Sequence, residues 1–202
     1  MKIIALSRND VFASNCFIII SGESFSVVDP SVGFEEASEI CPEILTLKPC
    51  KVLLTHAHVD HFYDIETYTR LGCEVLVSAK DASLLDNVFM NCAVMLHSHY
   101  CGYNGPIREI KGGEVISLGD NEAEVICTPG HTAGSVCYRI GEKIFTGDTL
   151  FANGGYGRCD LPTGDERDLF NSLKQLFSLN GNITIYPGHG GISTLKETAE
   201  FF

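Results

Sequence analysis

The chain has 202 residues, of which 45% are hydrophobic and 20% charged, and its formal net charge is −12 at pH 7. This length and composition are ordinary for one globular domain, so we expect residues 1–202 to form a single domain. The negative charge disfavours nucleic acid as a partner, because binding to phosphates depends on clustered Lys and Arg. No apolar stretch approaches the roughly 18 residues of a membrane helix, so no membrane partner is expected.

The nine cysteines bear on the cellular compartment. Their number is odd and no two of them form a C-x-x-C pair, which disfavours a zinc knuckle. The apolar run that begins at Met1 is too short for a signal peptide and is more typical of a first strand. We therefore expect reduced thiols and a cytoplasmic location.

Short apolar strands alternate with turn signals in the first part of the chain. Residues 1–6 are expected to form a strand, and residues 12–20 and 25–29 a hairpin around Ser21-Gly22-Glu23-Ser24. The following elements are then expected in order: a helix over 34–41 ended by Pro42, a strand over 51–54, a helix over 64–71, a strand over 74–77 and a helix over 80–88.

Residues 89–113 have weak periodicity, and we expect a long loop or lid over a site. His97-Ser98-His99 lies in this segment and raises the possibility of a further metal site. No strand fixes these residues, so a polar loop is the favoured interpretation. Tyr100 and Tyr103 are candidates for substrate contact from the loop.

The second part of the chain repeats the pattern of strands followed by helices. Its expected elements are strands over 115–118, 123–127, 135–140 and 143–145, an amphipathic helix over 165–179, a strand over 183–186 and a helix over 194–202. Strands come first in both parts, and helices are interspersed. This order suits an α/β fold with two packed sheets and helices outside, although periodicity alone leaves other α/β layouts open.

A cluster of metal-ligand side chains directly follows the strand over 51–54. It reads His56-Ala57-His58-Val59-Asp60-His61. Alternate residues of an extended loop point the same way, so His56 and His58 can converge on one cation. Asp60 and His61 follow a turn of the chain and can face a second cation. A solvated polar loop is the alternative, and four such residues after a buried strand make it a poor one.

Three further segments each place one ligand-type residue beside a glycine after an apolar strand. A glycine lets the backbone turn sharply and approach a metal closely. Each segment alone is a weak signal, but together with the first cluster they indicate one site. The segments are Thr128-Pro129-Gly130-His131, Phe145-Thr146-Gly147-Asp148-Thr149 and Tyr186-Pro187-Gly188-His189-Gly190.

In order and approximate spacing, these motifs resemble those of the metallo-β-lactamase superfamily, from about residue 15 to 191. Gly157-Arg158-Cys159-Asp160 followed by Leu161-Pro162-Thr163-Gly164 is similar to the small glyoxalase II-like (hydroxyacylglutathione hydrolase-like) hydrolases. The resemblance implies an αββα sandwich with the site at the sheet edge. The chain ends about a dozen residues after His189, so we expect the C-terminal helical domain of full glyoxalase II to be missing.

The resemblance also implies the metal ligands. One metal is held by His56, His58 and His131, a second by Asp60, His61 and His189, and Asp148 bridges the two. Three imidazoles suit zinc, whereas a set with a carboxylate also accepts iron or manganese. A hydroxide between the two cations is nucleophilic at neutral pH, and Asp60 is expected to orient it and carry its proton to the leaving group.

Arg158 is the candidate substrate-binding residue, because it falls where glyoxalase II enzymes have a basic residue near the thiol conjugate. The alternative is a structural ion pair between Arg158 and Asp160, and the sequence favours neither. Asp160 stands where those enzymes have an aromatic residue, which puts recognition of glutathione itself in doubt.

The leading functional hypothesis is hydrolysis of small thioesters of the S-lactoylglutathione kind, by a monomer or small homo-oligomer. The alternative is a persulfide dioxygenase, in which His56, His131 and Asp148 hold a single iron. A lactonase with the same metal centre comes third. A metal-binding protein without catalytic activity has no support, because all seven ligand positions are filled.

Overall fold

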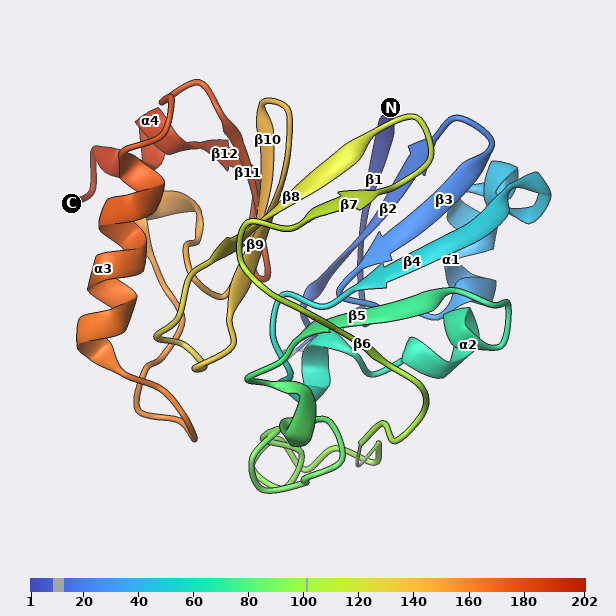
Figure 1. Ribbon diagram of the computed structural model, residues 1–202, viewed down its shortest axis with the longest axis horizontal. Helices are drawn as coiled ribbons and strands as arrows, with labels where there is room; N and C mark the ends of the chain where they lie inside the picture. Colours follow the sequence, from blue (N-terminus) through green and yellow to red (C-terminus); the bar gives the residue numbers. More distant parts are fainter. Residues whose placement is uncertain (9–12, 101) are drawn as a thin grey trace.

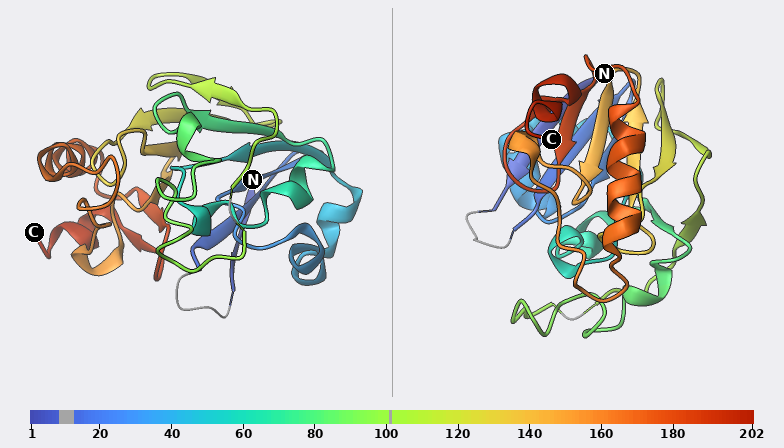
Figure 2. Two further views of the ribbon diagram at one scale, coloured as in Figure 1. Left: turned by 90° about the horizontal axis from the view of Figure 1, so that it is seen from below. Right: turned by 90° about the vertical axis from the view of Figure 1, so that its left-hand side faces the viewer.

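The computed structural model describes residues 1–8, 13–100 and 102–202. Two six-stranded sheets pack against each other, and helices cover the outer side of each sheet (Figure 1). The same layers are visible from two further sides in Figure 2. This arrangement is the expected αββα sandwich.

The first sheet contains the strands from the first half of the chain, in the order β1-β2-β3-β4-β5-β6. β1, β2 and β3 are antiparallel, and β3 to β6 are parallel. Its strands are β1 (Lys2–Ser7), β2 (Asn15–Ser21), β3 (Ser24–Val28), β4 (Lys48–Leu53), β5 (Glu74–Ser78) and β6 (Arg108–Ile110).

The second sheet has the order β12-β11-β10-β9-β8-β7. β10 and β11 are parallel, and the other neighbours are antiparallel. Its strands are β7 (Val115–Ser117), β8 (Glu122–Cys127), β9 (Val136–Ile140), β10 (Lys143–Gly147), β11 (Thr184–Pro187) and β12 (Ser193–Thr194).

The helices divide between the two outer faces (Figure 1). α1 (Phe34–Ile40) and α2 (Ile65–Thr69) cover the first sheet, and α3 (Glu166–Phe177) and α4 (Leu195–Ala199) cover the second. Short 3-10 turns are η1 (Pro42–Thr46), η2 (Val59–His61), η3 (Ala82–Leu84) and η4 (Ala152–Gly154). Among the described residues, no helix combines the length and apolar character that crossing a membrane requires.

Alternation along the strands explains the layers. In β2, Phe17 and Ile19 lie in the core between the two sheets, whereas Ile18 lies in the core under α1 and α2. Successive side chains of a strand point to opposite faces, so a strand that is apolar throughout serves two cores at once. In the same way, Leu169 and Leu173 of α3 pack on the outer face of the second sheet.

The structure corrects four expected elements. The helix expected over 80–88 is only the turn η3, because the buried Asp81 side chain bonds to other loops and Asn87 Oδ1 accepts hydrogen bonds from two backbone N–H groups that follow it. The loop expected over 89–113 contains β6. The last helix ends at Ala199 rather than 202. The strand expected from Phe12 begins at Asn15, and Phe12 itself lies outside the described residues.

Candidate metal centre

The carboxyl ends of four strands meet at one edge of the sandwich. β8, β10 and β11 run in the same direction, so the loops that follow them bring His131, Asp148 and His189 together. β4 of the other sheet leads into the loop that carries His56 and His58. All seven predicted side chains lie in this one region of the molecule.

Three imidazole rings form the first group of potential ligands. His56 Nε2 lies 3.1 Å from His58 Nδ1, and His131 Nε2 lies 3.2 Å from the former atom and 2.9 Å from the latter. Nitrogens bound to one zinc ion at about 2.0–2.1 Å in a tetrahedral arrangement lie roughly 3.3 Å apart. The spacing of the three nitrogens therefore fits a single cation between them.

The second group combines carboxylates with imidazoles. His61 Nε2 lies 3.6 Å from Asp60 Oδ2 and 3.2 Å from Asp148 Oδ1. His189 Nε2 lies 3.4 Å from Asp60 Oδ2 and 3.5 Å from Asp148 Oδ2. Asp148 Oδ2 is also 3.6 Å from His131 Nε2, so this carboxylate reaches both groups.

The chemistry of these atoms fits divalent cations. His61 Nε2 and Asp148 Oδ1 are buried, and neither makes a hydrogen bond. Leaving such polar atoms without a partner is costly, and a cation between them removes that cost. The potential ligand atoms of His56, His61 and Asp148 lie within 4.8 Å of one another, as do those of Asp60, His61 and His189. The cluster is thus a metal-binding arrangement of His and Asp side chains.

The two groups differ in charge. Burial and the neighbouring imidazoles lower the pKa of His56 well below 6.5 and that of His58 to about 3, so both rings are neutral at neutral pH. Burial acts in the same direction on His61 and His189, but here the carboxylates outweigh it. Asp148 and Asp60 raise the pKa of His61 well above 6.5 and that of His189 to about 9.

Asp29, which was not among the residues predicted from the sequence, orients two of the ligand rings. Its Oδ2 accepts hydrogen bonds from His61 Nδ1 (2.8 Å) and from the Thr55 hydroxyl (2.7 Å). The Thr55 hydroxyl donates its single proton to Asp29, so it can only accept in its contact with His56. Its oxygen lies 3.1 Å from His56 Nδ1, which therefore donates to it. Both rings therefore turn Nε2 toward the metal centre. The available signal was an acidic residue directly after the apolar strand Phe25 to Val28.

Asp81 connects two ligand loops and was likewise missed. It is fully buried and accepts hydrogen bonds from Ala57 N (3.1 Å), Thr132 Oγ1 (2.7 Å) and Gly134 N (2.8 Å). One carboxylate thereby fixes the loop of His56 and His58 against the loop of His131.

Two glycines allow the close approach of the ligand loops. A Cβ atom at Gly188 would lie 2.2 Å from Asp148 Oδ1 and 2.7 Å from His61 Cε1. A Cβ atom at Gly157 would lie 2.6 Å from His131 Nδ1 and 2.4 Å from the backbone oxygen of Asp148. Any larger residue at either position would displace a ligand side chain.

Arg158 acts on the centre through its backbone. Its carbonyl oxygen accepts a hydrogen bond from His131 Nδ1 (2.6 Å), which leaves Nε2 of that ring for a cation. The guanidinium donates from Nε and Nη2 to the two carboxylate oxygens of Asp160, both at 2.8 Å. The ion pair considered from the sequence is present, and Arg158 also lines the cleft above the ligands.

That cleft has apolar walls over a polar floor. The floor includes His58, Asp60, His131, Asp148 and His189. The walls come from the loop after η3 and from the segment after β10, and they are Met95, Leu96, Phe151, Tyr156 and Leu161. A small organic molecule can therefore reach the ligands along an apolar surface.

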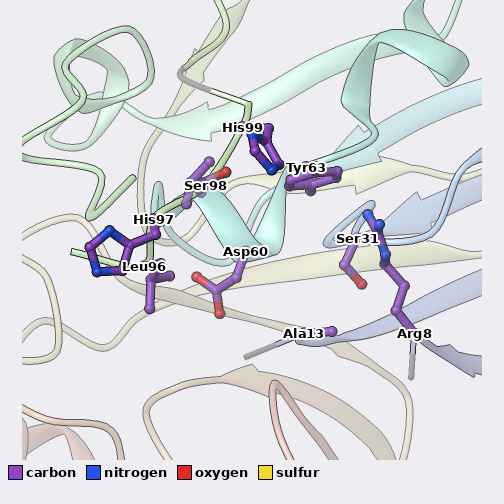
Figure 3. Close-up of a pocket in the computed structure, with 10 residues that line it drawn as sticks. Arg8, Ala13, Ser31, Asp60, Tyr63, Leu96, His97, Ser98 and His99 are labelled. Carbon is purple, nitrogen blue, oxygen red and sulfur yellow. The ribbon is translucent and has the colours of Figure 1, made fainter. Parts of the chain in front are cut away.

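His97 and His99 stand apart from the ligands. Among the described residues, the groups of potential metal ligands include neither of them. Both line a smaller pocket next to Asp60 (Figure 3). Tyr103 is buried and donates to the backbone oxygen of Pro106 (3.1 Å).

Comparisons with known proteins agree with the fold and with a metal-dependent hydrolase family. A "Probable metallo-hydrolase MJ0888" of Methanocaldococcus jannaschii is 35% identical over 90% of this chain and 89% of its own length. A "Probable polyketide biosynthesis zinc-dependent hydrolase PksB" of Bacillus subtilis is 30% identical over 91% of this chain and 76% of its own. The solved structure of TTHA1623 in a di-iron-bound form is 29% identical, covers 98% of both chains and superposes with a TM-score of 0.85. The sequence model of the metallo-beta-lactamase superfamily matches residues 9–189. This chain therefore belongs to the metallo-beta-lactamase superfamily.

Proposed function

We propose that the protein is a binuclear metal-dependent hydrolase of small thioesters, of the hydroxyacylglutathione kind. The observation that carries the proposal is the position of Asp148, whose carboxylate lies within 3.6 Å of ligand nitrogens in both groups. A carboxylate shared in this way suits two neighbouring cations better than one. Family membership and relatives named as metallo-hydrolases support the hydrolytic class.

Two divalent cations supply Lewis acidity and lower the pKa of water. His56, His58 and His131 would hold one of them, Asp60, His61 and His189 the other, and Asp148 would contact both. Zinc is the proposed metal, since a relative is named as a zinc-dependent hydrolase. Iron and manganese are the alternatives, because the second group includes carboxylates and one structural neighbour holds two irons.

Asp60 is the proposed catalytic residue. Its carboxylate lies at the floor of the cleft, where it can orient an attacking water and carry the released proton to the departing thiolate. Water and thioester thereby give a thiol and a carboxylic acid, which then releases its proton to solvent at neutral pH. Arg158 lines the same cleft, and Nη1 is the guanidinium nitrogen not bonded to Asp160, so it is a candidate contact for the substrate. The apolar walls suit the stem of a thioester.

The test combines metal analysis with substrates. The purified protein, loaded with zinc, iron or manganese in turn, is assayed against S-lactoylglutathione, simple acyl thioesters, lactones and glutathione persulfide. Two metal ions per chain with thioester hydrolysis are expected. One iron per chain with oxygen uptake on the persulfide would instead establish the dioxygenase. Turnover of lactones alone would instead establish the lactonase. We also propose that the protein acts on a small-molecule substrate in the cytoplasm, as a monomer or small homo-oligomer.

A further inference from the structure

A second pocket opens beside the metal centre and shares Asp60 and Leu96 with the cleft. Figure 3 shows Arg8, Ser31 and Tyr63 on one side of Asp60 and His97 on the other. Seven of its ten described lining residues carry a polar or charged group, although more of the exposed lining surface is apolar, as in the cleft. The lining residues are Arg8, Ala13, Ser31, Val59, Asp60, Tyr63, Leu96, His97, Ser98 and His99.

Arg8 is held in place without using up its hydrogen-bond donors. Its guanidinium carbon lies 4.3 Å from the centre of the Tyr63 ring, and Nη1 is 3.2 Å from Asp64 Oδ2. A guanidinium carries five N–H donors in a planar fork, so one contact through Nη1 leaves most of them for another group. The side chain is 34% exposed and can therefore reach a ligand in the pocket.

The wall across from Arg8 also carries nitrogen donors. His97 lies across Asp60 from Arg8, and His99 lies beside Tyr63 (Figure 3). The φ of His97 is 51°, which is unusual for a residue other than glycine. Such backbone strain persists where the surrounding structure imposes it, often at binding sites. Among the described residues that line the pocket, Asp60 is the one carboxylate, and the cations of the neighbouring centre would offset its charge.

We propose that this pocket binds a carboxylate at one end of the substrate, with Arg8 as the cation that recognises it. The proposal rests on the proposed function and deepens it, because it assigns recognition of an acidic group of the thioester to a pocket separate from the cleft. Arg–carboxylate pairs are charge-assisted and geometrically specific, which gives selectivity over a neutral substrate. The shared residue Asp60 places the acidic end next to the reacting carbonyl. The acid can belong to the acyl half or to the thiol half of the thioester.

The kinetic test uses wild type, Arg8→Met and Arg108→Met. Arg108 is a matched control, because it too pairs with one carboxylate, Glu114, and lines neither pocket. Each protein is assayed on two pairs of thioesters. In the first pair the acyl group is succinyl (acidic) or butyryl (neutral) on a neutral thiol, and in the second pair the acetyl group is carried by 3-mercaptopropionate (acidic) or its amide (neutral). We expect Arg8→Met to raise KM about 10-fold or more for one acidic thioester, with kcat changed less than about twofold. The two pairs show which half carries the acid.

The KM for the neutral thioester of each pair should change less than about twofold in Arg8→Met. Arg108→Met should leave the KM values of both the acidic and the neutral thioesters unchanged. Equal KM values for acidic and neutral thioesters in wild type, or equal losses on both in Arg8→Met, would overturn the proposal. Thermal unfolding of each variant establishes that it is folded, and Arg8→Lys, which keeps the charge but not the fork, should restore part of the preference.

A binding measurement separates this proposal from the proposed function. Calorimetry measures the affinity of the zinc-loaded protein for glutarate and for its monoamide. Both ligands offer one carboxylate to the metals, and only glutarate has a second one for the pocket. Tighter binding of glutarate by about 10-fold in wild type, lost in Arg8→Met, supports the pocket even if no thioester is turned over. Thioester hydrolysis without any preference for the acidic ligands would leave the proposed function standing and refute the carboxylate pocket.

Discussion

The group of His56, His58 and His131 and the group of Asp60, His61 and His189 share one site but differ in charge. The first brings neutral rings together, and burial keeps the pKa of His56 and His58 below the ordinary value. In the second, carboxylates raise the pKa of His61 and His189, so that two protonated rings occupy the region that suits a cation. Metal binding must therefore displace protons from the second group and not from these two rings of the first. The two groups are expected to differ in affinity, pH dependence and choice of metal.

The largest effect is expected where the groups meet. Asp148→Asn keeps the size of the side chain but removes the negative charge that lies near both groups. We expect activity to fall about 1000-fold, which corresponds to roughly 4 kcal/mol of transition-state stabilisation, together with loss of at least one metal ion. Elemental analysis and kcat/KM measure both effects. A variant that retains two metals and near-normal activity would show that the carboxylate is not shared.

Substituting one ring in each group tests whether the groups act separately. His58→Ala and His189→Ala should each lose about one of two metal ions, and activity should fall about 100-fold or more in both. The ion retained by His189→Ala is expected to bind with an affinity that depends less on pH between 6.5 and 9 than that of the ion retained by His58→Ala, because the rings of His56 and His58 are neutral over this range. That of His58→Ala should weaken toward pH 6.5, because the rings of the second group are then protonated. Simultaneous loss of both ions in either variant would indicate one cooperative site.

A smaller effect is expected from substituting Asp29, which orients the His61 ring directly and the His56 ring through Thr55. Asp29→Asn weakens the hydrogen bonds to His61 and to Thr55, and we expect metal affinity to fall 10–100-fold, a range common for such partners. Asp81→Asn is the matched comparison, because it alters a buried aspartate whose hydrogen bonds go to Ala57, Thr132 and Gly134 and not to a ligand ring. It should reduce stability while lowering metal affinity less than about 10-fold. Equal losses of affinity would mean that loop position, and not ring orientation, matters.

The smallest effect concerns the stability of the metal-free protein. The folded-state pKa of His58 is about 3, so the unfolded state alone gains its proton as the pH falls below 6.5, and stability declines. The folded-state pKa of His189 is about 9, so its contribution is complete below 6.5 and is lost as the pH rises toward 9. Denaturant unfolding should show a maximum near pH 6.5, with changes on the order of 1–2 kcal/mol on each side. A steady rise from pH 5 to 9 would contradict the assigned difference between the groups.

The sequence predicts ten of the twelve described strands, all except β6 and β12, and the convergence of the seven side chains. The convergence is predictable because these side chains follow apolar strands and three of them stand beside a glycine. It does not predict Asp29 or Asp81. A single aspartate carries no periodic pattern, and its partners lie 24 or more positions away along the chain. The contacts of Asp81 also explain why the expected helix over 80–88 is wrong. The pocket of Arg8 depends on residues from four separate segments, which only the fold brings together.

The hydrogen bond from His131 to the carbonyl of residue 158 has a consequence for how this protein can evolve. Every amino acid provides the same carbonyl oxygen, so the ring of His131 stays oriented whichever side chain stands at position 158. That side chain lines the cleft and is exposed, which leaves it open to selection by new substrates. Mutation at this position can thus alter what the enzyme accepts while the metal ligand keeps its orientation.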